Sequence, residues 1–148
     1  MIRSSSSFVV AFTFTFTLAV AAAAAAAPSL EAWGKARIQA NLVQPLAKKE
    51  ESRSRFSRAA PPPTERRVRV LASTLSRDAK GRGFLPYAID ARYGDDEWSE
   101  TYVGCIYDKT GLLFVAVGDE HRPAEFLLGK KAEPVPGVCQ VAPPAERS

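Results

Sequence analysis

Residues 102–117 have the sequence YVGCIY (102–107), DKTG (108–111) and LLFVAV (112–117). Two six-residue runs rich in β-branched and aromatic side chains flank a polar segment that ends in glycine, a pattern typical of a β-hairpin. Glycine at the last turn position permits the left-handed backbone that a four-residue connection often needs. The second run is apolar on both faces, so we expect it to form a central strand.

Two further strands are expected before this hairpin. Residues 67–70 alternate arginine with valine, which indicates a half-buried strand. After a turn at 81–83, a second strand is predicted to place these residues on one face: Leu85, Tyr87, Ile89, Ala91 and Tyr93. Pro86 falls on the opposite face, and because proline has no N–H to donate, it predicts an edge position.

The chain after the hairpin is expected to complete the sheet. Gly118–Pro123 predicts a turn, Ala124–Leu128 a fifth short strand, and Pro134–Cys139 a segment that returns to the sheet. The predicted fold class is therefore mainly β: a small antiparallel five-stranded meander or partly open barrel with one disulfide, preceded by a short helix and a basic linker. This domain spans 65–141, and residues 142–148 are expected to form a disordered tail.

Residues 28–64 form a helical, basic and proline-rich N-terminal arm. Ser29 is a suitable helix N-cap, and Pro45 is expected to end a helix over 29–44 that could pack on the sheet through Trp33. The charged stretch 46–58 has little to bury, so we expect it to be helical only in part or on binding. Three prolines at 61–63 predict a stiff extended spacer.

The first 27 residues have the features of a secretory signal peptide. Arg3 gives a basic start, an apolar run begins at Phe8, and an alanine tract ends at Ala27. The run is just long enough to span a bilayer, so an uncleaved anchor is the alternative. Interspersed threonines and the cleavable alanine tract favour removal. We therefore expect a secreted or periplasmic protein with no membrane span after cleavage.

The two cysteines, Cys105 and Cys139, are expected to form a disulfide in an oxidising compartment. Closing such a loop would stabilise the fold by roughly 4 kcal/mol on chain entropy alone. A reactive thiol or a metal ligand is the alternative.

Charge is distributed unevenly along the chain. Residues 28–92 contain fourteen Lys/Arg and six Asp/Glu, whereas residues 93–148 contain five and ten. The arginines of the basic part predict contacts with an anionic group, because a guanidinium pairs with phosphate or carboxylate through two hydrogen bonds. They are Arg53, Arg55, Arg58, Arg66, Arg67 and Arg69. A solubilising linker is the alternative role.

The expected partner is an anionic polymer, a lipid headgroup or an acidic protein. No nucleic acid is expected, because the chain is expected to be exported and only Phe56 interrupts the basic run as an aromatic base-stacking residue. Aromatic residues in or near the strands form either an exposed patch for protein or sugar, or core contacts. Tyr87 and Trp98 are the candidate binding residues among Tyr87, Tyr93, Trp98, Tyr102 and Tyr107.

Catalytic alternatives depend on the single histidine, His121, beside Asp119 and Glu120. A small hydrolase could use this imidazole with the neighbouring carboxylates, and Cys105 is a conceivable nucleophile. Metal binding by His121, or calcium binding by the acidic loop 95–97 with Glu100, lacks the usual ligand spacing. We expect no cofactor, no metal and no catalytic residue. The favoured function is a noncatalytic binding or structural module, with a hydrolase or an inhibitor-like protein presenting the 108–111 turn as alternatives.

Overall fold

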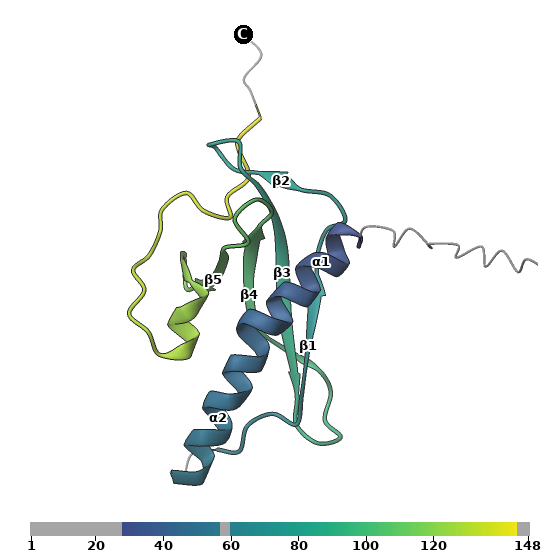
Figure 1. The fold of residues 1–148 in the computed structure, drawn as a ribbon, viewed down its shortest axis with the longest axis vertical. Coiled ribbons are helices and arrows are strands. Elements are labelled where there is room, and N and C mark those ends of the chain that lie inside the picture. The colour runs from purple at the N-terminus through teal and green to yellow at the C-terminus, as the bar shows by residue number, and fades with distance from the viewer. Residues whose placement is uncertain (1–27, 57–59, 145–148) are drawn as a thin grey trace, which may run out of the picture.

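The structure is a computed structural model that describes residues 28–56 and 60–144, with a mainly antiparallel sheet crossed on one face by a helix (Figure 1). The strands are β1 (Glu65–Val70), β2 (Ser76–Arg77), β3 (Gly83–Arg92), β4 (Ser99–Tyr107), β5 (Leu113–Val117) and β6 (Glu120–Pro123). Their order is β1-β3-β4-β5-β6, with the two-residue β2 also paired to β3. The predicted antiparallel meander is confirmed, and the sheet is not closed into a barrel. The predicted signal peptide, Arg58 and residues 145–148 lie outside the described residues.

The predicted hairpin is formed by β4 and β5. Gly111 has a φ of 66°, and its N–H donates to Tyr107 O at 2.9 Å to close the turn. β5 pairs with β4 on one side and β6 on the other. The expectation that the second run is a central strand is therefore confirmed.

Two predictions at the C-terminal end are wrong. Residues 120–123, expected in a turn, form β6, because Gly118 adopts a φ of 61° and reverses the chain within two residues. Residues 124–128, expected as a strand, form a 3₁₀ helix (Ala124–Leu128) that ends at Gly129 with a φ of 83°. The helical spacing directs Ala124 and Leu127 into the same core.

Pro86 does not mark an edge strand. β3 pairs with β1 and β2 on one side and with β4 on the other, so it is the central strand. Pro86 O accepts from Leu71 N at 2.9 Å, and the nitrogen of a strand residue points to the same side as its oxygen. The missing N–H therefore faces the gap between β1 and β2, where residues 71–75 leave the sheet.

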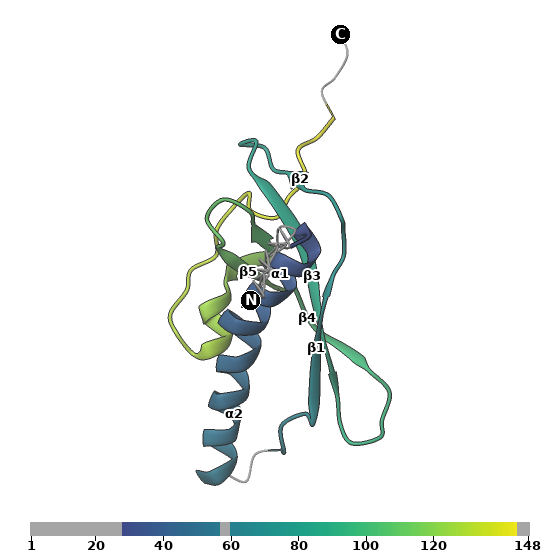
Figure 2. The same cartoon turned by 45° about the vertical axis from the view of Figure 1, so that its right-hand side comes forward.

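Pro45 does not end the helix, which is also a correction. Helix α1 (Leu30–Ile38) continues through a π-helical turn (Gln39–Val43) into α2 (Gln44–Phe56) (Figures 1 and 2). Gln44 N donates to Gln39 O, five residues back, and this wider turn accommodates the proline that cannot donate to Asn41 O. Leu42 and Leu46, on either side of Pro45, are both buried, so packing favours a continuous helix.

The helix and the sheet share one hydrophobic core. Ile38 and Leu42 pack against the face of the sheet that carries Leu85, Tyr87 and Ile89. The predicted common face of these three strand residues is confirmed, as is the packing of the Trp33 helix. No helix among the described residues is long and apolar enough to cross a membrane.

A smaller core occupies the other face of the sheet. It contains Phe84, Tyr107 and Phe114, and the returning segment packs on it through Val138. The predicted disulfide joins Cys105 in β4 to Cys139, with a Cα–Cα distance of 5.7 Å. The disulfide therefore fixes the C-terminal segment over the core on the sheet face opposite α1 and α2.

Candidate functional site

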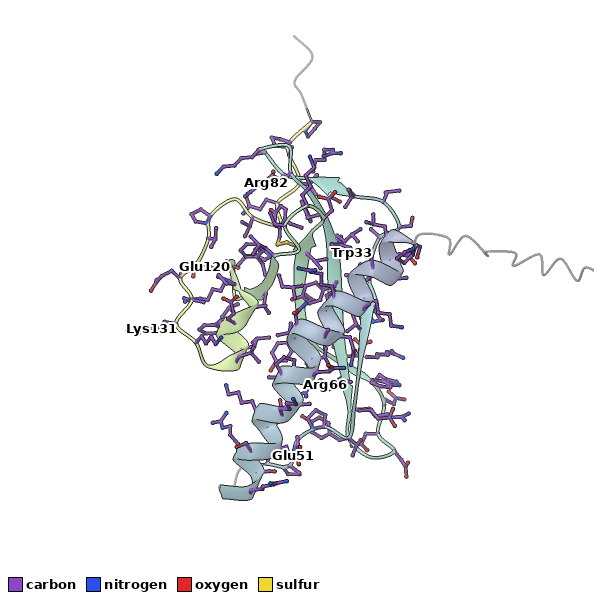
Figure 3. The ribbon with its side chains drawn as sticks, viewed as in Figure 1. Trp33, Glu51, Arg66, Arg82, Glu120 and Lys131 are labelled. Carbon is purple, nitrogen blue, oxygen red and sulfur yellow. A yellow bond between two sulfur atoms is a disulfide. The ribbon has the colours of Figure 1, made fainter. Side chains whose placement is uncertain are left out.

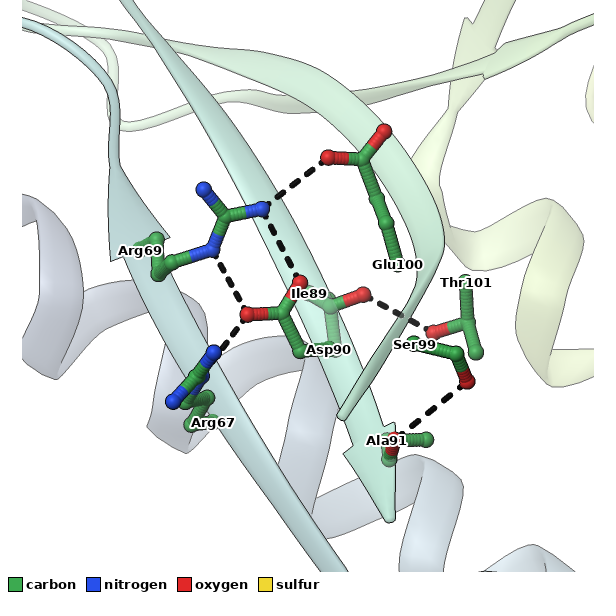
Figure 4. Close-up of polar contacts among 8 residues, drawn as sticks. All are labelled: Arg67, Arg69, Ile89, Asp90, Ala91, Ser99, Glu100 and Thr101. Carbon is green, nitrogen blue, oxygen red and sulfur yellow. Dashed lines mark hydrogen bonds and ion pairs between the residues drawn. The ribbon is translucent and has the colours of Figure 1, made fainter. Parts of the chain in front are cut away.

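The predicted basic residues of β1 are paired with a buried carboxylate. Asp90 in β3 is 2 % exposed, and Arg67 Nε donates to its Oδ2 at 2.7 Å. Arg69 donates to both oxygens of Asp90, at 2.6 and 3.0 Å, and to Glu100 at 3.0 Å (Figure 4). The hydrogen bonds from Arg69 are the main cause that lowers the pKa of Asp90. Arg67 and Arg69 are thus engaged within the chain.

Trp98 contacts two guanidinium groups. The centre of Arg67's guanidinium is 4.4 Å from the indole centroid, and that of Arg92 is 5.0 Å away. Arg92 also donates to Glu65 at 2.7 Å. Such cation–π contacts hold the indole against the sheet. Trp98 therefore stabilises this arginine cluster, and its side chain is also partly exposed.

Tyr87 is fully buried on the helix side of β3. Its hydroxyl donates to Phe114 O at 2.8 Å, and burial raises its pKa. The structure therefore places Tyr87 in the core, away from Trp98 and without accessible surface for a ligand.

A cavity of about 320 Å³ lies where the end of α2, the proline segment and the sheet meet. Arg66 in β1 lies beside α2 (Figure 3), lines this cavity and pairs with Glu50. The Arg66 side chain is 9 % exposed and that of Glu50 22 %. Within the described part of the chain, Arg66 Nε and Glu50 Oε2 have no hydrogen-bond partner. Both atoms are buried, so neither is exposed to a ligand in the cavity.

The rest of the lining combines a cation with aromatic groups. Arg53 and Ser54 come from the same face of α2 as Glu50, because residues three and four apart on a helix are neighbours. Tyr93 and Tyr102 come from the sheet, and Tyr93 is 47 % exposed. We call this set the α2 cavity: Glu50, Arg53, Ser54, Arg66, Tyr93 and Tyr102.

The other predicted helix arginines lie elsewhere. Arg55 is exposed and paired with Glu51 at 2.9 Å, beside Lys48 and Ser52 rather than in the α2 cavity. Arg58 lies outside the described residues. Of the six predicted arginines, the structure thus brings Arg53 and Arg66 together at one cavity.

The region of His121 was the basis of the catalytic alternative. A hollow of about 150 Å³ is lined by His121, Asp119 and Glu120 together with residues of the segment 134–140. Burial lowers the pKa of His121, which favours the neutral imidazole. No serine, threonine or cysteine is among the described residues that line this hollow.

The cysteine and metal alternatives can also be placed. Cys105 is in the disulfide, so it is not the thiol that a Cys–His pair requires. The side chains of Asp95, Asp96 and Glu97 are exposed. Across residues 28–56 and 60–144, no three His, Cys, Asp or Glu side chains lie together as metal ligands would.

Sequence reasoning missed Glu50 and Asp90, the two carboxylates that organise these arginines. The spacing of Glu50, Arg53 and Ser54 on one helix face was a signal for the first. A lone carboxylate in the apolar run Ile89-Asp90-Ala91 was a signal for the second, because a buried carboxylate requires a cationic partner. No protein-family model, curated protein or solved structure matches the chain.

Proposed function

We propose that this protein is an exported, noncatalytic binding module that holds an acidic polysaccharide in the α2 cavity. The observation that carries the proposal is that one cavity is lined by the exposed cation of Arg53 and the exposed ring of Tyr93. A guanidinium of this kind can pair with a carboxylate through two hydrogen bonds.

The chemistry of the lining supports an acidic sugar. Arg53 can pair with a carboxylate, while the hydroxyl of the exposed Ser54 can donate to and accept from sugar hydroxyls. Tyr93 presents an exposed aromatic ring on which a sugar face can pack. A repeating uronic acid supplies all three groups within one residue of the polymer.

The same lining supports binding without catalysis. Glycoside hydrolysis generally uses two carboxyl groups on either side of the scissile bond. Glu50 is the one carboxylate among the described lining residues, and it is paired with Arg66. This arrangement suits recognition better than acid–base chemistry.

A polymer is favoured over a lipid surface by the charge pattern of α2. The exposed side of α2 carries both signs, including Lys48, Glu51 and Arg55. None of the large exposed apolar side chains lies on residues 44–55 of α2. Membrane-surface helices instead combine a basic face with an apolar one.

Export remains part of the proposal. We infer that residues 1–27 direct the chain out of the cytoplasm and are removed. The Cys105–Cys139 disulfide supports this inference, because disulfides persist in oxidising compartments.

Calorimetric titration with polygalacturonate, and with neutral dextran for comparison, tests the function. We expect polygalacturonate to bind at low salt and weaken as salt increases, and dextran to bind at least tenfold more weakly. Arg53→Gln should weaken polygalacturonate binding about tenfold or more, the amount expected for a charge-assisted hydrogen bond. Arg55→Gln is the matched control on the same helix and should leave the affinity unchanged.

Three results would overturn the proposal. Equal losses for the Arg53 and Arg55 variants would mean that charge density alone attracts the polymer. Equal affinity for dextran would remove the role of the anion. Tight binding to anionic lipid vesicles, with none to polygalacturonate, would assign the module to a membrane surface.

A further inference from the structure

A second cavity, of about 400 Å³, lies at the end of the sheet away from the α2 cavity. Figure 3 shows Arg82, on its border, near the β2 end of the molecule, with Arg66 toward the opposite end. The β2–β3 turn forms one side of the cavity and the β4–β5 turn forms the other. We call this set the turn cavity: Lys80, Arg82, Tyr107, Lys109, Leu112 and Phe114.

Glycine turns and a backbone hydrogen bond hold the two turns close together. Gly81 and Gly111 adopt φ values of 75° and 66°, which glycine reaches without strain. Asp108 N donates to Gly83 O at 3.1 Å and joins one turn to the other. A Cβ on Gly83 would lie 3.1 Å from Asp108 Oδ1 and 2.9 Å from Leu75. The sides of the cavity are therefore held by backbone contacts.

The base of the turn cavity is aromatic and apolar. Tyr107 and Phe114 pack edge to face, with centroids 5.6 Å apart and ring planes at 81°. The Tyr107 hydroxyl donates to the buried Asp78 at 2.8 Å, which fixes the orientation of its ring. Leu112, which also lines the cavity, is 54 % exposed. Tyr107 and Phe114 are only 4 % and 7 % exposed, so Leu112 is the main apolar side chain that a ligand can reach.

The rim is cationic, and two of its cations are free to bind. Arg82 is engaged with Asp78 at 2.8 Å, and its guanidinium lies over Tyr107. Lys80 and Lys109 are exposed, one on each turn, and neither forms an ion pair with a described residue. Asp108 is the one carboxylate among the described lining residues. The cavity thus presents two ammonium groups above an apolar base.

We propose that the turn cavity binds a small aromatic anion, in which a flat apolar ring system carries a carboxylate or sulfonate. Its volume is within the range of about 300–1,000 Å³ typical of small-molecule sites. The ring would pack on Leu112, over the largely buried Tyr107 and Phe114, and the anion would lie near Lys80 and Lys109. This site is independent of the α2 cavity and of the function proposed for it.

The test is an NMR titration of the disulfide-bonded protein with naphthalene-2-sulfonate. Neutral 2-naphthol and inorganic sulfate are titrated in parallel. We expect the sulfonate to shift amide signals within residues 77–83 and 107–114, and to bind at least fivefold more tightly than either comparison ligand. Binding of 2-naphthol with equal affinity would overturn the role of the lysines, and shifts confined to other residues would overturn the location.

Variants at the rim and the base separate the two contributions. Lys80→Gln with Lys109→Gln should weaken sulfonate binding three- to tenfold and leave 2-naphthol binding unchanged. Leu112→Asn should weaken both aromatic ligands. Lys131→Gln removes a cation that is exposed elsewhere and is the control for net charge. A loss from Lys131→Gln as large as that from the double variant would show nonspecific attraction and overturn the proposal.

Discussion

Tyr87 lies directly over Gly104, its partner on the neighbouring strand. The two residues face each other across β3 and β4. A Cβ added to Gly104 would lie 2.7 Å from the Tyr87 Oη, and it would also collide with Phe114 O, the acceptor of the Tyr87 hydroxyl. The missing side chain at 104 is therefore what lets a buried phenol reach the backbone of β5.

Gly104→Ala should consequently destabilise the fold. Because the obstructing atoms include backbone, the neighbours cannot simply rotate away, and we expect a loss of about 2–3 kcal/mol in the free energy of unfolding. Chemical denaturation measures it. Gly34→Ala is the control, since its Cβ would make ordinary contact with Leu85 at 3.4 Å within a helix. That variant should be neutral or slightly stabilising, and equal losses from the two variants would contradict the steric argument.

Asp90→Asn should destabilise the sheet, because it leaves the guanidinium groups of Arg67 and Arg69 without their carboxylate. These two side chains are 46 % and 43 % exposed, so water compensates part of the loss. We expect about 2 kcal/mol at pH 7, less than for a fully buried pair. Glu100→Gln, which changes an exposed partner of Arg69, should cost well under 1 kcal/mol.

The same carboxylate predicts a pH dependence. Hydrogen bonds from Arg69 lower the pKa of folded Asp90 below its unfolded value of about 3.9. A group of this kind stabilises the fold above the unfolded pKa, and that stabilisation is lost as the pH falls through the folded pKa. The stability difference between the natural protein and Asp90→Asn should therefore shrink below about pH 4. A constant difference from pH 7 to pH 2.5 would contradict it.

Patterns confined to a few neighbouring residues predicted the strands well. The 102–117 hairpin depends on alternation and on one glycine, both of which are visible locally. The predictions for Pro45 and for residues 124–128 were wrong because tertiary packing decides the structure at both places. Burial of Leu42 and Leu46 stabilises a continuous helix across the proline. Ala124 and Leu127 pack in the core between the helix and the sheet.

The candidate sites depended on contacts between distant residues. Arg66 meets Glu50, and Arg69 meets Asp90, across separations that no local pattern reveals. The basic run therefore divides into arginines that are paired within the chain, on β1 and at Arg55, and Arg53, which has no ion pair with a described residue. The strand register sets Arg69 opposite Ala88 and beside Asp90, and this is why Arg69 is paired within the chain.

Tyr107→Phe should loosen the C-terminal segment. The Tyr107 hydroxyl donates to Asp78 and accepts from Cys139 N at 3.1 Å, so one atom links the β2–β3 turn to the disulfide. Its removal leaves a buried carboxylate with one donor fewer and should cost about 1–2 kcal/mol. Amide hydrogen exchange should then be faster at Cys139. Tyr93→Phe, at an exposed ring, should change neither stability nor exchange.

Reduction of the Cys105–Cys139 bond should destabilise the protein more than these single substitutions. The bond closes a loop across 34 positions, and loss of that constraint is worth roughly 4 kcal/mol on chain entropy. The segment that covers Phe84, Tyr107 and Phe114 would also lose its covalent tie, so their apolar surface would become exposed more readily.

A thermal melt with and without reductant measures the effect of the disulfide. We expect reductant to lower the melting temperature substantially and to increase the binding of a hydrophobic dye before the main transition. The double variant Cys105→Ser with Cys139→Ser should melt at the lower temperature in both conditions, because it has no bond to reduce. An unchanged melt of the natural protein under reductant would mean that the helix-side core alone sets its stability.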